Sequence, residues 1–199
     1  MAYRDFSFAR IKDEFGITTV YRKLFENIEE VEPSQKLKAD LDSIDDMPMS
    51  TEKLISEALV FPILQDIRLN NRSMLRLFSG ENLNADKKRG LNGECDFIIT
   101  KDPEIIELHT PIITVVEAKK GVVDDPKSLA QLTAQMIGAR VFNQKNDAYQ
   151  IIHGACTSGK DWLFLKLEND TLYIDQANYG LNNVPQLLGV LQRIINFYK

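Results

Sequence analysis

Acidic and basic side chains meet at the end of one apolar segment of the sequence. Residues 112–116 are all apolar or β-branched, and Glu117, Ala118 and Lys119 follow them directly. If this segment is a β-strand, Glu117 and Lys119 lie on the same face, because side chains alternate along a strand. Charges at the rim of a hydrophobic core need a partner or a metal. The pattern therefore marks a candidate site.

A second carboxylate stands earlier in the chain, at the start of another apolar run. Asp96 comes just before residues 97–99, which are all apolar. If the two segments pair as strands, the carboxylates of Asp96 and Glu117 can approach each other, with Lys119 beside them. Two carboxylates suit a hard divalent cation such as Mg²⁺, which takes oxygen ligands and keeps several waters. A cation and a nearby ammonium together suit phosphodiester hydrolysis.

The same residues also have plainer interpretations. A Glu-x-Lys pair at a strand end is often a solvated ion pair, and a rim closed by salt bridges would indicate a purely structural partner protein. His109 and His153 have no metal-ligand spacing to each other or to the two cysteines, so we expect structural or surface roles for them. Cys95 and Cys156 form no Cys-x-x-Cys motif, so we predict reduced, buried thiols and no zinc site.

The elements that must position these residues follow from the apolar periodicity. Strands are expected over residues 73–78, 94–100, 112–119, 149–155, 162–167 and 172–174. Helices are expected over residues 20–31, 37–44, 51–67, 128–143 and 184–198. Pro62 should kink or split the third of these helices. Strands near the middle, with helices at both ends and one between them, predict an α/β fold.

Composition and charge limit the class of protein. The chain has 199 residues, 44% of them hydrophobic, which is enough for one sizeable core. It has no transmembrane-length apolar run and no apolar leader, so we expect no membrane partner and a cytoplasmic location. The net charge of -5 argues against a protein held on nucleic acid mainly by a basic surface. Residues 68–89 hold six basic and two acidic residues, so a modest phosphate-facing patch is expected there.

The order and spacing of the charged residues resemble a known signature. Asp96, followed after 20 residues by Glu117-Ala118-Lys119, resembles the D…(D/E)xK signature of the PD-(D/E)XK nuclease superfamily. Residues 51–64 are similar to the helix that opens the N-terminal nuclease domain of type I restriction enzyme R subunits. Gln131 resembles the glutamine that follows the lysine in many members, and Gln135 lies four residues further along. Cys95 stands where the superfamily name has proline.

The resemblance implies a fold and a domain arrangement. The expected fold is a restriction-endonuclease-like α/β/α core with a central mixed sheet and extra N-terminal helices. We expect the nuclease-like domain to comprise residues 50–199. Residues 1–49 would be a helical extension packed into the same compact unit.

The resemblance also implies a metal-dependent nuclease that uses Mg²⁺, with Mn²⁺ as a substitute. Asp96, Glu117 and the Ala118 carbonyl would hold the metal, with an acidic residue of the opening helix. Glu52 is the preferred acid and Glu57 the alternate, because five residues are about 140° apart around a helix and both cannot face one metal.

Two further residue roles follow from the same resemblance, and the sequence also indicates the partners. Lys119 would orient the attacking water or stabilise the developing charge, and Gln131 would hold Lys119 or a phosphate oxygen. The substrate would be nucleic acid, with DNA preferred, and the apolar stripe of residues 184–198 favours a homodimer. The chain has no GxxxxGK[ST] motif, so an energy-coupled role would need a separate ATPase or specificity partner. The alternative is a catalytically silent nucleic-acid-binding or assembly module with the same fold.

Overall fold

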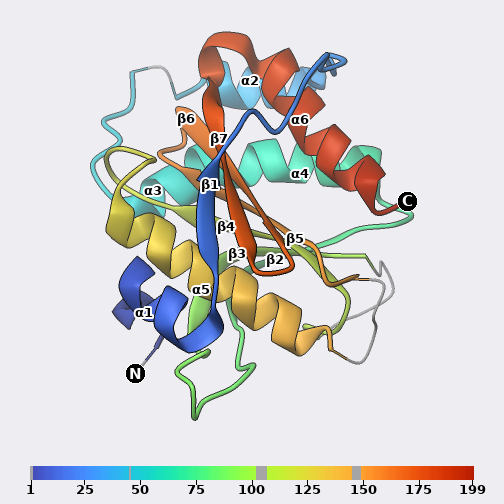
Figure 1. Cartoon of the computed structure of the whole chain (residues 1–199). Helices are drawn as coiled ribbons and strands as arrows, with labels where there is room; N and C mark the ends of the chain where they lie inside the picture. Colours follow the sequence, from blue (N-terminus) through green and yellow to red (C-terminus); the bar gives the residue numbers. More distant parts are fainter. Residues whose placement is uncertain (1, 45, 102–106, 145–148) are drawn as a thin grey trace.

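The strands form a seven-stranded sheet in the computed structural model, which describes residues 2–44, 46–101, 107–144 and 149–199 (Figure 1). They are β1 (Thr18–Tyr21), β2 (Arg76–Asn82), β3 (Glu94–Thr100), β4 (Ile112–Ala118), β5 (Ile152–Thr157), β6 (Asp161–Glu168) and β7 (Thr171–Gly180). Their order in the sheet is β1-β7-β6-β5-β4-β3-β2. The pairs β1–β7 and β4–β5 are parallel and the other pairs are antiparallel, so the sheet is mixed.

Helices cover both faces of this sheet (Figure 1). They are α1 (Phe8–Phe15), α2 (Gln35–Asp42), α3 (Glu52–Ile55), α4 (Phe61–Asn70), α5 (Pro126–Phe142) and α6 (Val184–Phe197), with the 3-10 turns η1 (Tyr3–Asp5) and η4 (Leu181–Asn183) and the π-helical turn η2 (Ser56–Val60). One hydrophobic cluster joins η1, α1 and α5 to the sheet, and the other joins α2, α3, α4 and α6 to the opposite face. The chain is therefore an α/β protein with a helical layer on each side.

The central strand β4 is buried along its whole length. Neighbouring strands and helices on both faces cover it, which explains its continuous apolar and β-branched sequence. The chain then crosses through α5 and returns in β5, parallel to β4. A parallel neighbour requires such a crossover, so the helix that follows Lys119 must pack across the sheet.

Pro62 divides the helical segment over residues 51–67 as predicted. The hydroxyl of Thr51 caps the start of α3 by accepting the Leu54 N–H at 3.1 Å. The helical hydrogen bonds then span five residues and not four, because the Phe61 N–H bonds to the carbonyl of Ser56. Proline lacks an N–H and its ring clashes with the carbonyl four residues earlier, and a π-helical turn relieves both problems.

The prediction of a helix over residues 20–31 is wrong. Residues 18–21 form β1 beside β7, and the chain continues along the sheet without helix until α2 begins. The Arg22 N–H donates to the Ile174 carbonyl at 3.0 Å, and the Leu24 N–H donates to the Asp175 carboxylate at 3.2 Å. Pairing with β7 outweighs the local periodicity, so the N-terminal segment is a strand with helices and not helical throughout. The other expected elements are present, with β2 shifted a few residues later and β5 starting at Ile152.

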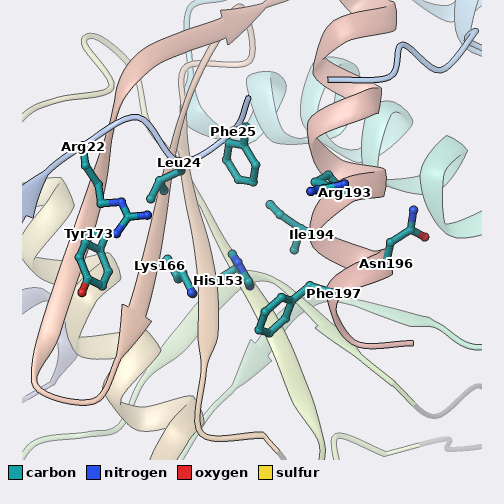
Figure 2. A pocket seen from close by; sticks show the side chains of 10 residues that line it. All are labelled: Arg22, Leu24, Phe25, His153, Lys166, Tyr173, Arg193, Ile194, Asn196 and Phe197. Carbon is teal, nitrogen blue, oxygen red and sulfur yellow. The ribbon is translucent and has the colours of Figure 1, made fainter. Parts of the chain in front are cut away.

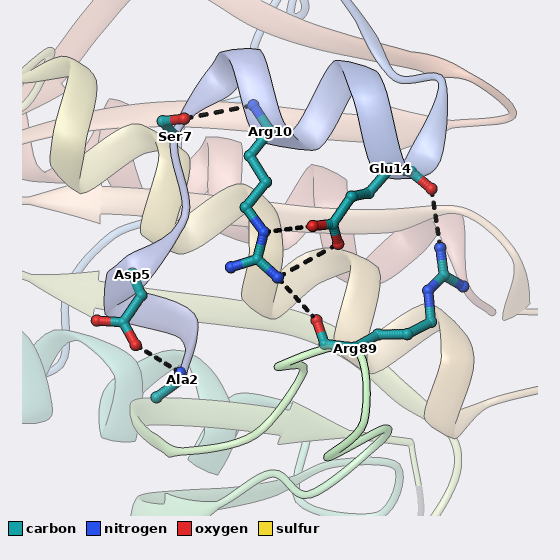
Figure 3. Close-up of polar contacts among 6 residues, drawn as sticks. All are labelled: Ala2, Asp5, Ser7, Arg10, Glu14 and Arg89. Carbon is teal, nitrogen blue, oxygen red and sulfur yellow. Dashed lines mark hydrogen bonds and ion pairs between the residues drawn. The ribbon is translucent and has the colours of Figure 1, made fainter.

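Two arginines join the N-terminal helix to a distant loop (Figure 3). Arg10 forms an ion pair with Glu14 at 2.6 Å and donates to the carbonyl of Arg89 at 3.2 Å. Arg89 in turn donates to the carbonyl of Glu14 at 3.0 Å and stacks over the ring of Phe15. Arg89 therefore serves a structural contact, which leaves less of the expected phosphate-facing patch free.

The apolar stripe of α6 is covered within the chain itself. Its members Leu187, Leu188, Leu191, Ile194 and Ile195 are each at most 2% exposed. The stripe thus packs on the sheet and α4, and its width no longer supports a homodimer. None of the helices in the described ranges is long and apolar enough to cross a membrane.

Candidate functional site

Strand pairing brings the two predicted carboxylates together. In the antiparallel pair β3–β4, Phe97 lies opposite Val116, so Asp96 sits at the same end of the sheet as Glu117. The Ala118 N–H donates to the Asp96 carboxylate at 2.7 Å. This bond fixes Asp96 against the last residues of β4.

Glu117 is the centre of a polar cluster on the face that α5 covers. Its side chain is 2% exposed, and its Oε1 forms an ion pair with the Lys119 Nζ at 2.8 Å. Gln131 donates to the same oxygen, and Gln135 donates to Oε2 at 2.6 Å. Glu117 and Lys119 thus share a face, and α5 supplies two further donors.

The glutamine contacts differ in part from the expectation. Gln131 was expected to hold Lys119 or a phosphate oxygen, whereas its amide holds the Glu117 carboxylate. Residues four apart on a helix face the same way, so Gln135 lies one turn further along and reaches the other oxygen. The pair was visible in the sequence as two glutamines on an otherwise apolar helix. Their common partner depended on how α5 crosses β4.

Burial and mutual repulsion perturb the acids. Burial raises the pKa of Glu117 to about 7, and the negative charge of Asp96 adds to this effect. Burial also raises the pKa of Asp96, although the Ala118 N–H opposes the shift. Burial would lower the pKa of Lys119, but the negative charges of Glu117, Glu52 and Asp96 outweigh it and raise the pKa. The cluster therefore holds more negative charge than a single ammonium balances.

The acidic residue of the opening helix is better placed at Glu52 than at Glu57. Glu52 accepts the Lys120 N–H at 3.2 Å, and its negative charge contributes to raising the pKa of Asp96. Glu57 is directed to the surface, where its side chain is 65% exposed and pairs with Lys53 at 3.9 Å. Of the two alternatives, Glu52 lies at the site.

A groove of about 400 Å³ runs between α3–η2 and the β2–β3 pair. Glu52, Glu57, Glu94 and Asp96 are among the residues that line it. Four carboxylates would repel a phosphate group, because like charges at close range disfavour approach. An anionic substrate would need cations between itself and this wall.

The donor chemistry of the site fits a hard divalent cation, although the carboxylates are not gathered around one point. Among the described residues, no three His, Cys, Asp or Glu side chains form a ready metal cluster. The Asp96 Oδ2 and the Glu117 Oε2 each accept one bond in the described structure, and a carboxylate oxygen has two lone pairs. The N–H and C=O of one strand residue point to the same side, which places the Ala118 carbonyl on the β3 side of β4. Mg²⁺ often binds through one or two carboxylates and keeps its waters, so these residues fit it.

The two histidines lie outside this site, whereas Cys156 borders it, because it lies opposite Glu117 in the parallel pair β4–β5. His109 is exposed and contacts Thr110, while His153 is 4% exposed and hydrogen-bonded to Tyr198 at 2.7 Å. Both cysteines are free and buried, as the sequence predicted.

Comparisons with protein-family models, with curated proteins and with solved structures give no match for this chain. Any functional conclusion must therefore come from the residues and their geometry. The features that bear on it are the two adjoining carboxylates, the lysine paired with one of them, and the acid on the opening helix.

Proposed function

We propose that the protein is a metal-dependent nuclease that hydrolyses phosphodiester bonds of DNA, with a restriction-endonuclease-like fold. The observation that carries the proposal is the convergence of Asp96, Glu117 and Lys119 at one end of the paired strands β3 and β4. The mixed sheet, the helices on both faces and the crossover through α5 support the fold. The signature residues occur in the expected order.

In this proposal Asp96, Glu117 and the Ala118 carbonyl would hold Mg²⁺, with Glu52 reaching it directly or through water. When bound, the cation supplies Lewis-acid polarisation of the scissile phosphate and a lower pKa for a coordinated water. Glu117 must be ionised to serve as a ligand.

The neighbouring side chains prepare that carboxylate and the reacting groups. Gln131 and Gln135 hold both oxygens of Glu117 in one orientation. Lys119 exchanges its contact with Glu117 for the water or phosphate oxygen, where its charge stabilises the negative charge that develops on phosphorus.

A specific observation favours the second candidate, a catalytically silent nucleic-acid-binding or assembly module. Lys119 already has a partner in Glu117, and the adjoining groove is acidic. A site in which Lys119 stays paired with Glu117 would bind nucleic acid without cleaving it. The two candidates differ in whether a divalent cation breaks the ion pair between Glu117 and Lys119.

The proposal is tested by incubating the purified protein with single-stranded, duplex and branched DNA and with RNA, with and without Mg²⁺ or Mn²⁺. We expect wild-type protein to cleave DNA only with the cation. Glu117→Ala should lose both cleavage and metal binding, since a ligand oxygen is removed. Glu57→Ala is the matched control, and it should keep both.

Two outcomes would decide against the nuclease. One is an absence of metal-dependent cleavage on every substrate, together with an affinity for one of them that falls as salt rises. That result would establish the silent module. The other is cleavage that Glu117→Ala leaves unchanged, which would place the chemistry elsewhere.

A further inference from the structure

A second cavity lies on the opposite face of the sheet from Glu117 (Figure 2). Its volume is about 320 Å³, and it is bounded by residues 22–25, by strands β5–β7 and by the end of α6. His153 lies among its lining residues and packs against Phe197 of α6, whereas Glu117 contacts α5. The cavity is therefore separate from the proposed catalytic site.

Three cationic side chains from different elements line this cavity, with Arg22 beside Tyr173 on one side and Arg193 on α6 on the other (Figure 2). Arg22 follows β1, Lys166 belongs to β6, and Arg193 belongs to α6. Lys166 forms an ion pair with Glu168 at 3.0 Å, but neither arginine has an ion pair within the described residues. No acidic side chain lines the cavity in the described part of the chain. The cavity thus presents positive charge that the protein itself does not neutralise.

The nearby carboxylates do not cancel this charge. Asp175 lies on the same face, but it is 2% exposed and its oxygens accept two backbone N–H groups and a tyrosine hydroxyl. Glu29 and Glu30 line a separate groove that Arg193 also borders, and neither pairs with it. His153 contributes no charge near neutral pH, because burial lowers its pKa to about 3 and the charge of Lys166 acts in the same direction.

Aromatic rings form part of the cavity wall beside the cations. Phe197 is 52% exposed, and the Lys166 ammonium lies 5.4 Å from the centre of its ring. On the other side, the Arg22 guanidinium lies 5.0 Å from the centre of the Tyr173 ring. An exposed ring next to cationic groups is a platform on which a flat ring of a ligand can stack.

We propose that this cavity binds a mononucleotide unit, with its phosphate between Arg22, Lys166 and Arg193 and its base against Phe197. The volume is at the lower end of about 300–1,000 Å³ for small-ligand pockets, which suits one such unit and not a longer strand. A phosphate beside a base occurs both in a free nucleotide and at the phosphorylated end of a strand. The proposal does not rest on the nuclease activity, because it uses none of the residues proposed for catalysis.

Isothermal titration of the full chain tests the proposal with AMP, adenosine, inorganic phosphate, and an oligonucleotide with and without a 5′-phosphate. We expect saturable binding of AMP that weakens with salt, and weaker binding of adenosine and of inorganic phosphate. The double variant Arg22→Gln/Arg193→Gln should bind AMP about ten- to hundredfold more weakly, since it loses charge-assisted hydrogen bonds. Phe197→Ala should weaken the binding of AMP while leaving the binding of inorganic phosphate unchanged.

The controls separate this site from other effects. Arg4→Gln removes an exposed arginine outside the cavity and should keep wild-type affinity. Glu117→Ala should also bind AMP normally, so failure of the nuclease proposal leaves this result intact. Arg22 and Arg193 are exposed, so thermal melts should show the double variant folded.

Preference for the 5′-phosphorylated oligonucleotide over AMP would identify a strand end as the source, and preference for AMP would identify a free nucleotide. Either result supports the site. No saturable binding of AMP or of the phosphorylated oligonucleotide would overturn it. Equal affinity of wild-type protein and the double variant would do the same.

Discussion

Glu117 is both deeply buried and central to the proposed chemistry. Its carboxylate is 2% exposed and accepts bonds from three side chains, which hold it for a ligand role. Its pKa is raised to about 7 by burial and by Asp96, so near neutral pH the metal-free site keeps part of its protons. In the proposed site, a cation and a proton would therefore compete for the same oxygens.

This competition predicts a pH dependence of metal binding. As pH rises through about 7, Glu117 releases its proton in the folded state, and the raised pKa of Asp96 acts in the same direction. Metal then binds without displacing protons, so Mn²⁺ should raise the melting temperature more at pH 8 than at pH 6. Thermal melts at both pH values test this. An equal shift in Asp96→Ala would show that the metal binds elsewhere.

His153 should make the stability of the fold itself depend on pH. Its pKa is lowered to about 3 in the folded state against 6.5 when unperturbed, so the unfolded chain gains a proton first on acidification. The stabilisation from neutral His153 is present above about pH 6.5 and is lost as the pH falls toward 3, at up to about 1.4 kcal/mol per pH unit. The free energy of unfolding, measured with urea between pH 5 and 7, should therefore rise with a shallower slope against pH in His153→Gln than in wild-type protein. An unchanged slope in His153→Gln would refute the assignment.

Among the elements, α6 depends on a close contact with the chain that crosses it. Gly189 lies in the buried part of α6, and a Cβ there would meet the backbone of Glu29. Glycine costs helix stability, so alanine would help an isolated helix, but the clash with backbone cannot be relieved by rotating a side chain.

We therefore expect Gly189→Ala to lower the free energy of unfolding by about 1–3 kcal/mol. Arg193→Ala is the control on the same helix, because its side chain is exposed, and it should change stability by less than about 0.5 kcal/mol. Denaturant titrations of both variants give the comparison. A stabilised Gly189→Ala would mean that helix propensity outweighs the contact.

The elements that the sequence could predict are those whose signal is local. The apolar runs of β4 and β6 and the stripe of α6 each identify an element without knowledge of its neighbours. β1 could not be found in this way, because its four residues are all exposed and are held by pairing with β7, about 150 residues later. Likewise, the residue types at Gln131 and Gln135 were visible, but their shared partner Glu117 follows from the crossing of α5 over β4.

At the scale of the whole molecule, the N-terminal segment is built into both faces of the sheet. Tyr3 is 1% exposed, packs near Gly138 of α5, and donates to the Leu83 carbonyl at 2.9 Å. The segment after β1 packs on the α6 face, with Phe25 in the second hydrophobic cluster. These contacts tie the described residues of the 1–49 segment to the remainder of the chain.

We expect thermal unfolding to occur in one transition that includes the N-terminal segment. Tyr3→Ala should lower the free energy of unfolding by about 3–5 kcal/mol, because a buried aromatic ring and its hydrogen bond are lost. Tyr3→Phe keeps the ring and should lose only about 1–3 kcal/mol. Calorimetry tests this. Two separate transitions, with Tyr3→Ala affecting only one, would show that the segment unfolds independently.

The most direct test of the proposed nuclease compares Mg²⁺-dependent DNA cleavage by wild-type protein and Lys119→Ala, with Mn²⁺ affinity measured on the same samples. In the proposed mechanism, Lys119 acts on water and phosphate and is not a ligand. We therefore predict that the variant loses at least about a hundredfold in cleavage rate while its Mn²⁺ affinity stays largely intact. Cleavage by Lys119→Ala at the wild-type rate, or no cleavage by wild-type protein, would contradict the assignment of Asp96, Glu117 and Lys119 as a hydrolytic site.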